Sequence, residues 1–460
     1  MDQDKDVVSA QPMGGTSRKD FLKKSGTIAA GAAALAAAGA PALVEAAGVE
    51  KPRVLRELAQ TTITISRGSV TGPIDTMGDL IKKFERQNPN IKVKQLFAPQ
   101  SSTATHDQYV AQLSGGSSAV DIYRVDIIWP PEFAAAGWIL PLDKYITPSF
   151  KKDLLPGPVL GTTVNGKMYA IPLFTDSGML FYRTDLLQKY KIAPPTTWLD
   201  LVSAAQKVMA HEKSVPYGML WQGAQYEGLF CDVCELFWTN GGNVLQNFSG
   251  PKVVIDSPNN RWALQFMVDT IYKYKIAPRA VTTYMEEDTR HLWENGKSVF
   301  LRNWPYVWSR GNLPSSKIHG KFQLKPLPHG PHGKPAACLG GWNLAINAKS
   351  RNPDAAAKLA LYLTSFESQK YQSIKGSLNP ALSSVYHDPD ALKVNPWYRN
   401  FYEVVRNALP RPVSKDETKI SDRVTRQVEA ALKRQISVAT ALKNAQRDVE
   451  EIVGGANATP

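Results

Sequence analysis

The chain has 460 residues, of which 43% are hydrophobic and 21% charged, with 11 Trp, 17 Tyr and 15 Phe. This length and apolar content predict two or three domains or one large two-lobed unit, and they exclude a mainly disordered, collagen-like or coiled-coil chain. The net charge of +13 leaves open a nucleic-acid partner, an anionic surface or solubility alone, while 3 Cys are too few for a disulfide framework.

The first 46 residues have the pattern of an export signal. A basic segment at 17–24 precedes an apolar run rich in Ala and Gly at 27–44, and Val44-Glu45-Ala46 offers a small-residue cleavage site. The basic segment resembles a twin-arginine signal, but Lys19 stands in place of the second arginine, so the export route stays open. An ordinary Ala-rich helix is the alternative interpretation.

We expect the remainder to be an exported, soluble chain in the periplasm or at the outer face of the cytoplasmic membrane. Residues 47–60 are polar and are interpreted as a linker, and no later stretch is apolar enough to span a bilayer. The segment 1–46 holds five basic and five acidic residues, so its removal would leave the whole positive excess on the mature chain.

Strand and helix patterns alternate from residue 61 onward. Residues 61–65 are β-branched, 77–84 have helical apolar spacing, and 91–97 alternate as a strand does. A helix over 106–113 and a strand over 120–128 follow. This order predicts an α/β fold with a mainly parallel sheet, which binds ligands beyond the carboxyl ends of its strands.

The second half of the pattern contains a hairpin and several helices. Asn165-Gly166-Lys167 is typical of a hairpin turn, and a strand is expected over 179–182. Helices are expected over 184–190 and 196–210. Apolar spacing over 421–453 predicts two packed helices near the end of the chain.

Several strings, taken together and in this order, resemble the extracellular solute-binding proteins of ABC sugar importers, in the branch of the trehalose- and maltose-binding proteins. The strings occupy residues 81–93, 121–126, 136–142, 166–172, 180–187, 194–198, 340–347 and 352–356. The resemblance implies a two-lobed periplasmic-binding-protein-like fold of type II, in which hinge strands join discontinuous lobes. Carried over, lobe one comprises 60–173 and 309–364, and lobe two 174–308 and 365–460.

The resemblance also implies a ligand site in the cleft between the lobes. A sugar needs carboxylates, amides or guanidinium groups for its hydroxyls and flat rings for its C–H faces. Asp126, after a strand, and Asp176, where the chain is expected to cross between lobes, match ligand-binding aspartates of these relatives. A capping or turn aspartate is the alternative for each.

Aromatic residues and glycines supply the second part of the predicted site. Trp304 and Tyr306, in an Asn-Trp-Pro-Tyr string, resemble the stacking segment of the family, and Pro305 breaks regular structure between them. Gly340 and Gly341 would let backbone amides approach a ligand. Trp342 is expected to stack on the ligand or to belong to the core.

Three further residues complete the prediction. Arg411, between two prolines, matches an arginine that reaches the ligand in the relatives, and a fixed guanidinium suits bidentate recognition. Gln222 and Glu227 resemble a cleft-edge segment. Residues 69–72 contain no carboxylate, although the relatives have an acidic contact there, so the identity of the sugar stays open.

The remaining motifs do not indicate chemistry, and no metal or cofactor is expected. Cys231 and Cys234 have thioredoxin-like spacing but lack the ligands of a zinc site; a pairing among them or with Cys338 and simple buried thiols are both open. His329 and His332 lie in a loop rich in Gly and Pro.

The sequence thus predicts a monomeric receptor that binds a di- or oligosaccharide and delivers it to ABC permease subunits, without enzymatic activity. A glycosidase that uses Asp126 and Asp176 as paired carboxylates is the alternative. A nucleic-acid partner is not expected, because residues 411–434 mix seven basic with four acidic groups. Membrane association would come through the permease or an uncleaved signal.

Overall fold

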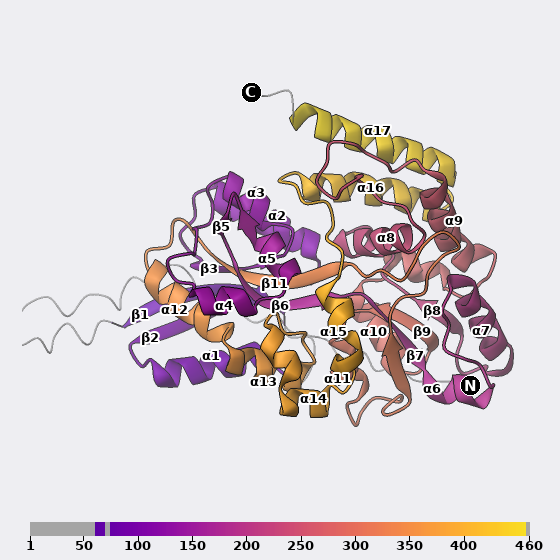
Figure 1. Ribbon diagram of the computed structural model, residues 1–460, viewed down its shortest axis with the longest axis horizontal. Helices are drawn as coiled ribbons and strands as arrows, with labels where there is room; N and C mark the ends of the chain where they lie inside the picture. The colour runs from indigo at the N-terminus through magenta and orange to yellow at the C-terminus, as the bar shows by residue number, and fades with distance from the viewer. Residues whose placement is uncertain (1–59, 70–73, 457–460) are drawn as a thin grey trace, which may run out of the picture. The chain divides into compact units, whose positions relative to one another are not determined.

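The computed structural model describes residues 60–69 and 74–456 (Figure 1). The predicted export signal, 1–46, and residues 47–59 of the predicted linker lie outside the described residues. None of the helices in the described ranges combines the length and the apolar character needed to cross a membrane.

The first sheet contains five strands in the order β2-β1-β3-β11-β6. Their bounds are β1 Thr61–Gly68, β2 Ile91–Ala98, β3 Ile122–Asp126, β6 Ile171–Ser177 and β11 Leu339–Ile346. β1 runs parallel to β2 and β3, as the alternating pattern predicts, but β11 is antiparallel to both of its neighbours. The sheet is therefore mixed, and not mainly parallel as expected. We call this sheet and the helices packed on it the first lobe.

Helices cover the first sheet with apolar faces. α1 (Thr76–Gln87) begins at Asp75, whose side chain accepts a hydrogen bond from the Gly78 N–H, and it buries Leu80, Ile81 and Phe84. The other helices of this part are α2 Ser102–Ser114, α3 Pro130–Ala135, α4 Pro148–Asp153, α5 Pro156–Thr162, α12 Pro353–Leu363 and α13 Phe366–Gly376. A predicted hairpin joins β4 (Thr163–Val164) to β5 (Lys167–Met168).

Positive φ angles explain that hairpin. Asn165 has φ 50° and Gly166 has φ 77°, the left-handed conformations that a tight hairpin turn requires and that Asn and Gly adopt most readily. The prediction of this turn is confirmed.

The second sheet has four strands in the order β10-β7-β9-β8. Their bounds are β7 Met179–Arg183, β8 Tyr217–Leu220, β9 Ser298–Asn303 and β10 Phe322–Lys325. We call this sheet and its helices the second lobe; the helices are α6 Thr184–Lys189, α7 Trp198–His211, α8 Glu227–Thr239, α9 Pro258–Tyr272, α10 Glu286–Glu294, α16 Glu417–Leu432 and α17 Val438–Ala456. α8 is buried along its whole length.

The two C-terminal helices, α16 and α17, lie side by side, as their apolar spacing predicts (Figure 1). α16 also packs against α8 and α17 against α9. Buried Val424, Val428 and Leu432 of α16 join the main core of the second lobe. This pair of helices therefore completes the second lobe.

Short helical elements complete the described secondary structure. They are η2 Arg279–Thr283, α11 Val307–Gly311, η3 Ser383–His387, α14 Pro389–Val394 and α15 Tyr398–Arg406. One apolar cluster includes residues of both lobes: Leu155 precedes α5 of the first lobe, and Phe181 lies on β7 of the second sheet. Tyr386 of η3 and Tyr398 of α15 belong to the same cluster.

The chain crosses between the sheets at Gly178, which separates β6 from β7, and again between β10 and β11. The predicted lobe limits differ from the observed pairing at two elements. β10 pairs with β7 in the second sheet, and α13 packs on α1 in the first lobe, whereas the predicted limits placed them in the opposite lobes. Local pattern predicts a strand or a helix, but which sheet or helix it joins depends on contacts distant in sequence.

Candidate ligand-binding site

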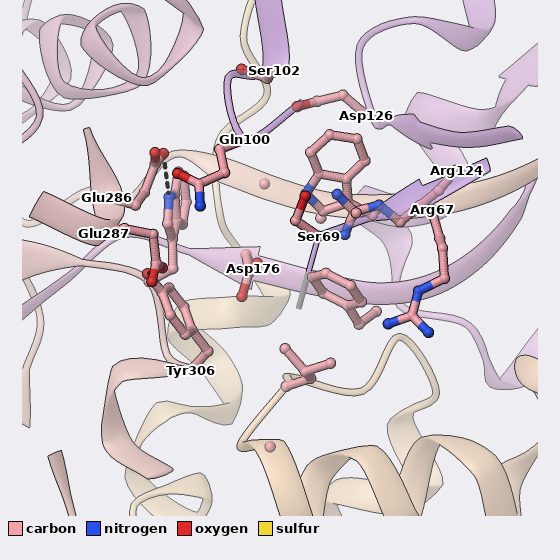
Figure 2. A pocket seen from close by; sticks show the side chains of 18 of the residues that line it. Arg67, Ser69, Gln100, Ser102, Arg124, Asp126, Asp176, Glu286, Glu287 and Tyr306 are labelled. Atoms are coloured by element: carbon pink, nitrogen blue, oxygen red, sulfur yellow. Dashed lines mark hydrogen bonds between the residues drawn. The ribbon is translucent and has the colours of Figure 1, made fainter. Parts of the chain in front are cut away.

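A cavity of about 270 Å³ lies between the two lobes. It is lined by the ends of β3, β6 and β11 from the first sheet and by residues of α8, α10 and the segment after β9 from the second lobe. Figure 2 shows Arg67 and Arg124 on one side, Glu286 and Glu287 on the other, and Asp176 between them. The volume is near the lower end for a small-molecule site, typically about 300–1,000 Å³.

Nine of the ten residues predicted from the sequence line this cavity. They are Asp126, Asp176, Glu227, Trp304, Tyr306, Gly340, Gly341, Trp342 and Arg411. Strand register brings several of them together, because Trp342 on β11 pairs with Asp126 on β3, and Gly340 pairs with Asp176 on β6.

Arg411 bridges the two lobes inside the cavity. Its Nη2 donates to Asp126 Oδ1 at 2.7 Å, and its Nη1 donates to Glu227 Oε1, also at 2.7 Å. Asp126 ends a strand of the first sheet and Glu227 begins α8, so a single guanidinium group links the lobes. Its side chain is only 1% exposed, and charge-assisted bonds of this length are strong when water is excluded.

Burial shapes the electrostatics around this bridge. Burial raises the pKa of Glu227, while Arg411 and a hydrogen bond from Ser421 oppose that rise. Burial also raises the pKa of Glu417 well above its usual value, and neither of its carboxyl oxygens has a hydrogen-bond partner among the described residues. Burial thus disfavours the charged form of both carboxyl groups, while the Arg411 guanidinium stabilises it.

Asp176 lies on β6 at the floor of the cavity and is 8% exposed. Burial raises the pKa of its carboxyl group well above the usual value, and Arg302 counteracts this only in part. Its Oδ1 has no hydrogen-bond partner in the described part of the chain. The hydrogen-bonding capacity of this Asp176 oxygen is thus not used by any residue that the structure describes.

Each of the two cavity tryptophans has an arginine against one face. The Arg302 guanidinium carbon lies 4.2 Å from the Trp304 ring centroid, and that of Arg124 lies 3.8 Å from the Trp342 ring centroid. Both distances are within the range of cation–π attraction. Trp304 also donates through Nε1 to Glu286 Oε1 at 3.3 Å, the dashed contact in Figure 2.

The two glycines are explained by close packing. A Cβ atom at Gly340 would lie 3.0 Å from the Trp304 ring, so glycine leaves room for the indole over β11. Gly341 has φ 122° and its Cβ would lie 2.6 Å from Phe174 O, so only glycine fits there without strain.

Gln222 is the one predicted residue that does not line the cavity. It is completely buried, donates through Nε2 to Thr289 Oγ1 at 2.9 Å, and accepts a hydrogen bond from Arg302 Nη1 at 2.9 Å. The side chain therefore points toward β9 and α10 and contacts Arg302 and Thr289, not the cavity.

Comparison with known proteins places this geometry in a family. Residues 68–370 match the family model described as bacterial extracellular solute-binding protein. The chain belongs to this family. A probable ABC transporter-binding protein of Deinococcus radiodurans is 41% identical over 369 residues, which covers 79% of this chain and 87% of the relative.

Solved structures agree with this assignment. A maltose-bound protein of T. maritima, MalE3, is 43% identical with a TM-score of 0.81, covering 85% of this chain and all of that chain. A solute-binding protein of Agrobacterium vitis with bound D-mannitol is 26% identical with a TM-score of 0.76, covering 87% of this chain and all of that one. The chain is therefore a two-lobed, maltose-binding-protein-like solute-binding component of an ABC transporter, as the sequence resemblance predicts.

Several charged residues that line the cavity of this solute-binding protein are not among those predicted from the sequence. These are Arg67, Arg124, Glu286, Glu287 and Arg310. The sequence does set Arg124 apart, because it is a charged residue inside an apolar strand, two positions before Asp126. Glu286 and Glu287 open α10, where acidic residues are common at any helix N-terminus, so the pattern does not set them apart.

The cysteines Cys231, Cys234 and Cys338 and the loop histidine His329 can now be placed in the structure of the solute-binding protein. Cys231, Cys234 and Cys338 are free and buried, and Cys231 also lines the cavity. The ring Nδ1 of His329 lies 2.8 Å from the backbone oxygen of Gly330. Within residues 60–69 and 74–456, no three potential ligands among His, Cys, Asp and Glu gather as a metal site.

Proposed function

We propose that the cavity binds a di- or oligosaccharide similar to trehalose or maltose and that the protein delivers it to the permease subunits of its transporter. The observation that carries this proposal is the combination, in one inter-lobe cavity, of two tryptophans with polar groups from both lobes. Aromatic rings suit the C–H faces of a pyranose, and carboxylates and guanidinium groups suit its hydroxyls.

The polar groups with unused hydrogen-bonding capacity favour a hydroxyl-rich ligand. Asp176 has one free acceptor oxygen, and no hydrogen bond of the Arg124 side chain occurs within the described residues. A sugar would bring donors and acceptors to both. The relative of known structure that is 43% identical has maltose bound, which supports a disaccharide; the mannitol-bound relative makes a polyol the main competitor.

Closure of the lobes is the proposed mechanism. Arg411 contacts residues of both lobes, and a ligand between the tryptophans would add further contacts that only the closed arrangement can make. A ligand that binds the closed state better shifts the population toward it. The permease would then meet a closed, loaded receptor.

Isothermal titration calorimetry against trehalose, maltose, sucrose, longer glucans and D-mannitol tests the ligand class. We expect heat of binding with at least one di- or oligosaccharide. Binding of D-mannitol alone, or of a peptide or polyamine without any sugar, would contradict the proposal. A retarded nucleic-acid band at physiological salt would also count against it.

The proposal includes binding without turnover. Asp126 is committed to an ion pair with Arg411 at 2.7 Å, which suits a fixed ligand contact better than a nucleophile or proton carrier. Prolonged incubation with the bound sugar should leave it intact by chromatography. Product whose formation is abolished in Asp126→Asn would instead support the glycosidase alternative.

We also propose export of the protein with residues 1–46 as its signal. The family is extracellular, and the segment has the charged and apolar parts of a signal. Mass spectrometry of the protein recovered from outside the cytoplasm should show a new N-terminus near residue 47. An intact N-terminus on the exported protein would mean that the signal is retained as an anchor.

A further inference from the structure

A buried ion-pair network lies directly behind Trp304. Arg302 on β9 is 1% exposed, and its Nε and Nη2 donate to the two carboxyl oxygens of Glu235 at 2.7 and 2.8 Å. Asp232 Oδ1 lies 2.8 Å from the same Nε. Such a bidentate pair fixes the plane of the guanidinium group.

The fixed guanidinium group in turn holds the indole of Trp304. The Arg302 guanidinium carbon lies 4.2 Å from the ring centroid, Glu286 accepts from the ring N–H, and Gly340 leaves the ring edge its space. Three separate contacts therefore define one orientation of the ring. A side chain ordered before binding does not have to lose its rotational freedom when the ligand arrives.

The same network touches two of the places where the chain crosses between the lobes, before β7 and before β11. Glu235 Oε1 accepts a hydrogen bond at 3.0 Å from the N–H of Cys338, the residue just before β11. At the other crossing, a Cβ atom on Gly178 would lie 1.8 Å from Glu235 Oε1 and 2.7 Å from Arg302 Nη2. Glu235 is thus bonded to one of these crossings and packed closely against the other.

We propose that Arg302 and Glu235 are positioning residues for ligand binding: they hold the Trp304 ring in its ligand-facing orientation and tie that orientation to the crossings before β7 and before β11. They act through Trp304, since neither lines the cavity. The inference rests on the proposed function in one respect, namely that Trp304 contacts a bound sugar.

A double-mutant cycle with maltose as the probe tests this positioning. Arg302→Lys keeps a charge for Glu235 but lacks the planar group that lies on the indole, and Gly178→Ala displaces Glu235 without touching the ring. We expect each to weaken maltose binding roughly 3- to 10-fold in calorimetry, the range for one side chain that must be ordered on binding. In a Trp304→Ala background, neither should weaken binding further.

Arg183→Met provides the matched control. Arg183 lies on β7 of the same lobe, is 7% exposed, and donates through Nε to Asp185 Oδ1 at 2.8 Å, but it does not line the cavity. It should lower the midpoint of urea unfolding while leaving the maltose affinity unchanged. This comparison separates positioning from a general loss of stability.

Failure of the positioning role and failure of sugar binding give different results in these measurements. Unchanged maltose affinity in folded Arg302→Lys, or an equal loss with and without Trp304, overturns the positioning role. Unchanged affinity in Trp304→Ala also overturns the inference, because Trp304 then does not contact the sugar. Absence of binding of every di- and oligosaccharide to the unsubstituted chain overturns the proposed function instead; if another of these sugars binds and maltose does not, that sugar is the probe of the cycle. If Gly178→Ala does not fold by circular dichroism, Arg302→Lys and Glu235→Gln carry the cycle.

Discussion

Trp304 is the residue whose role depends most directly on the ligand. It is half-buried, lines the cavity and is ordered by Arg302, Glu286 and Gly340, so its ring is available as a stacking surface. A core tryptophan would have its faces covered by apolar side chains. For this reason the stacking role is the one proposed for Trp304, which also packs against the core of the second lobe.

Replacement of Trp304 by alanine should weaken sugar binding by about 1–3 kcal/mol, because an aromatic anchor and its buried area are lost. Calorimetry with the best-binding sugar measures the change. Trp262→Ala is the control, since Trp262 stacks on Phe266 at 5.5 Å and lies outside the cavity lining. Equal losses in both variants would show that the effect is not local.

Asp176 should make stability depend on pH. Burial raises the pKa of its carboxyl above the usual 3.8, so the folded state favours the protonated form. Its contribution to the free energy of unfolding is then complete below about pH 3.8 and is lost as the pH rises through the higher folded-state pKa.

Asp176→Asn should therefore gain stability relative to the unsubstituted protein as the pH increases from 4 to 8. Urea unfolding at several pH values measures the difference between the two proteins. The same variant should bind sugar more weakly if the Asp176 carboxyl accepts a ligand hydroxyl. Stability curves that stay parallel over this range would contradict the assigned effect of burial.

At the scale of elements, β11 contributes three consecutive residues to the lining of the cavity. It supplies Gly340, Gly341 and Trp342, lies between β3 and β6, and follows directly on a crossing between the lobes. Its pairing shifts register between Trp342 and Asn343. Such an irregularity redirects side chains next to a binding site. Close to it, Gly341 has φ 122° and lies opposite Thr175.

Gly341→Ala should lower the free energy of unfolding by more than Gly137→Ala does. Both positions have positive φ, 122° and 70°, but only at Gly341 would the new Cβ meet backbone atoms, with Phe174 O at 2.6 Å; nothing lies within 4 Å at Gly137. The left-handed conformation alone costs about 1–2 kcal/mol. Urea denaturation of both variants measures the difference, and equal losses would contradict the steric explanation.

At the scale of the whole molecule, Arg411 joins the lobes through Asp126 and Glu227. Removing one partner of a buried ion pair leaves uncompensated charge and typically costs about 3–5 kcal/mol. Arg411→Met should therefore destabilise the protein by an amount in this range and favour separated lobes, because the bridge between them is lost.

Chemical denaturation and a fluorophore pair with one dye on each lobe measure these two effects. Exposed Arg426, which pairs with Asp422 on α16, gives a control: Arg426→Met should change neither the stability appreciably nor the distance between the dyes. An unchanged dye distance in Arg411→Met without sugar would show that the ion pair does not hold the lobes together.

The sequence by itself determined the local elements and the kinds of side chain at the site. Apolar periodicity and turn chemistry correctly predicted β1, α1, β2, the 165–166 turn and the C-terminal helix pair, since these depend on neighbouring residues. Strings resembling a known family pointed to Asp126, Asp176 and Trp304, which do meet in one cavity.

Tertiary structure alone decided which residues face that cavity and which stand behind it. Gln222 and Arg302 are polar residues in apolar surroundings, and no local pattern shows that they form a buried network with Glu235. The placement of β10 and α13 was likewise decided by pairing across more than a hundred residues. Sequence periodicity reports which face of an element is buried, whereas the partner against that face is chosen by the packing of the whole chain.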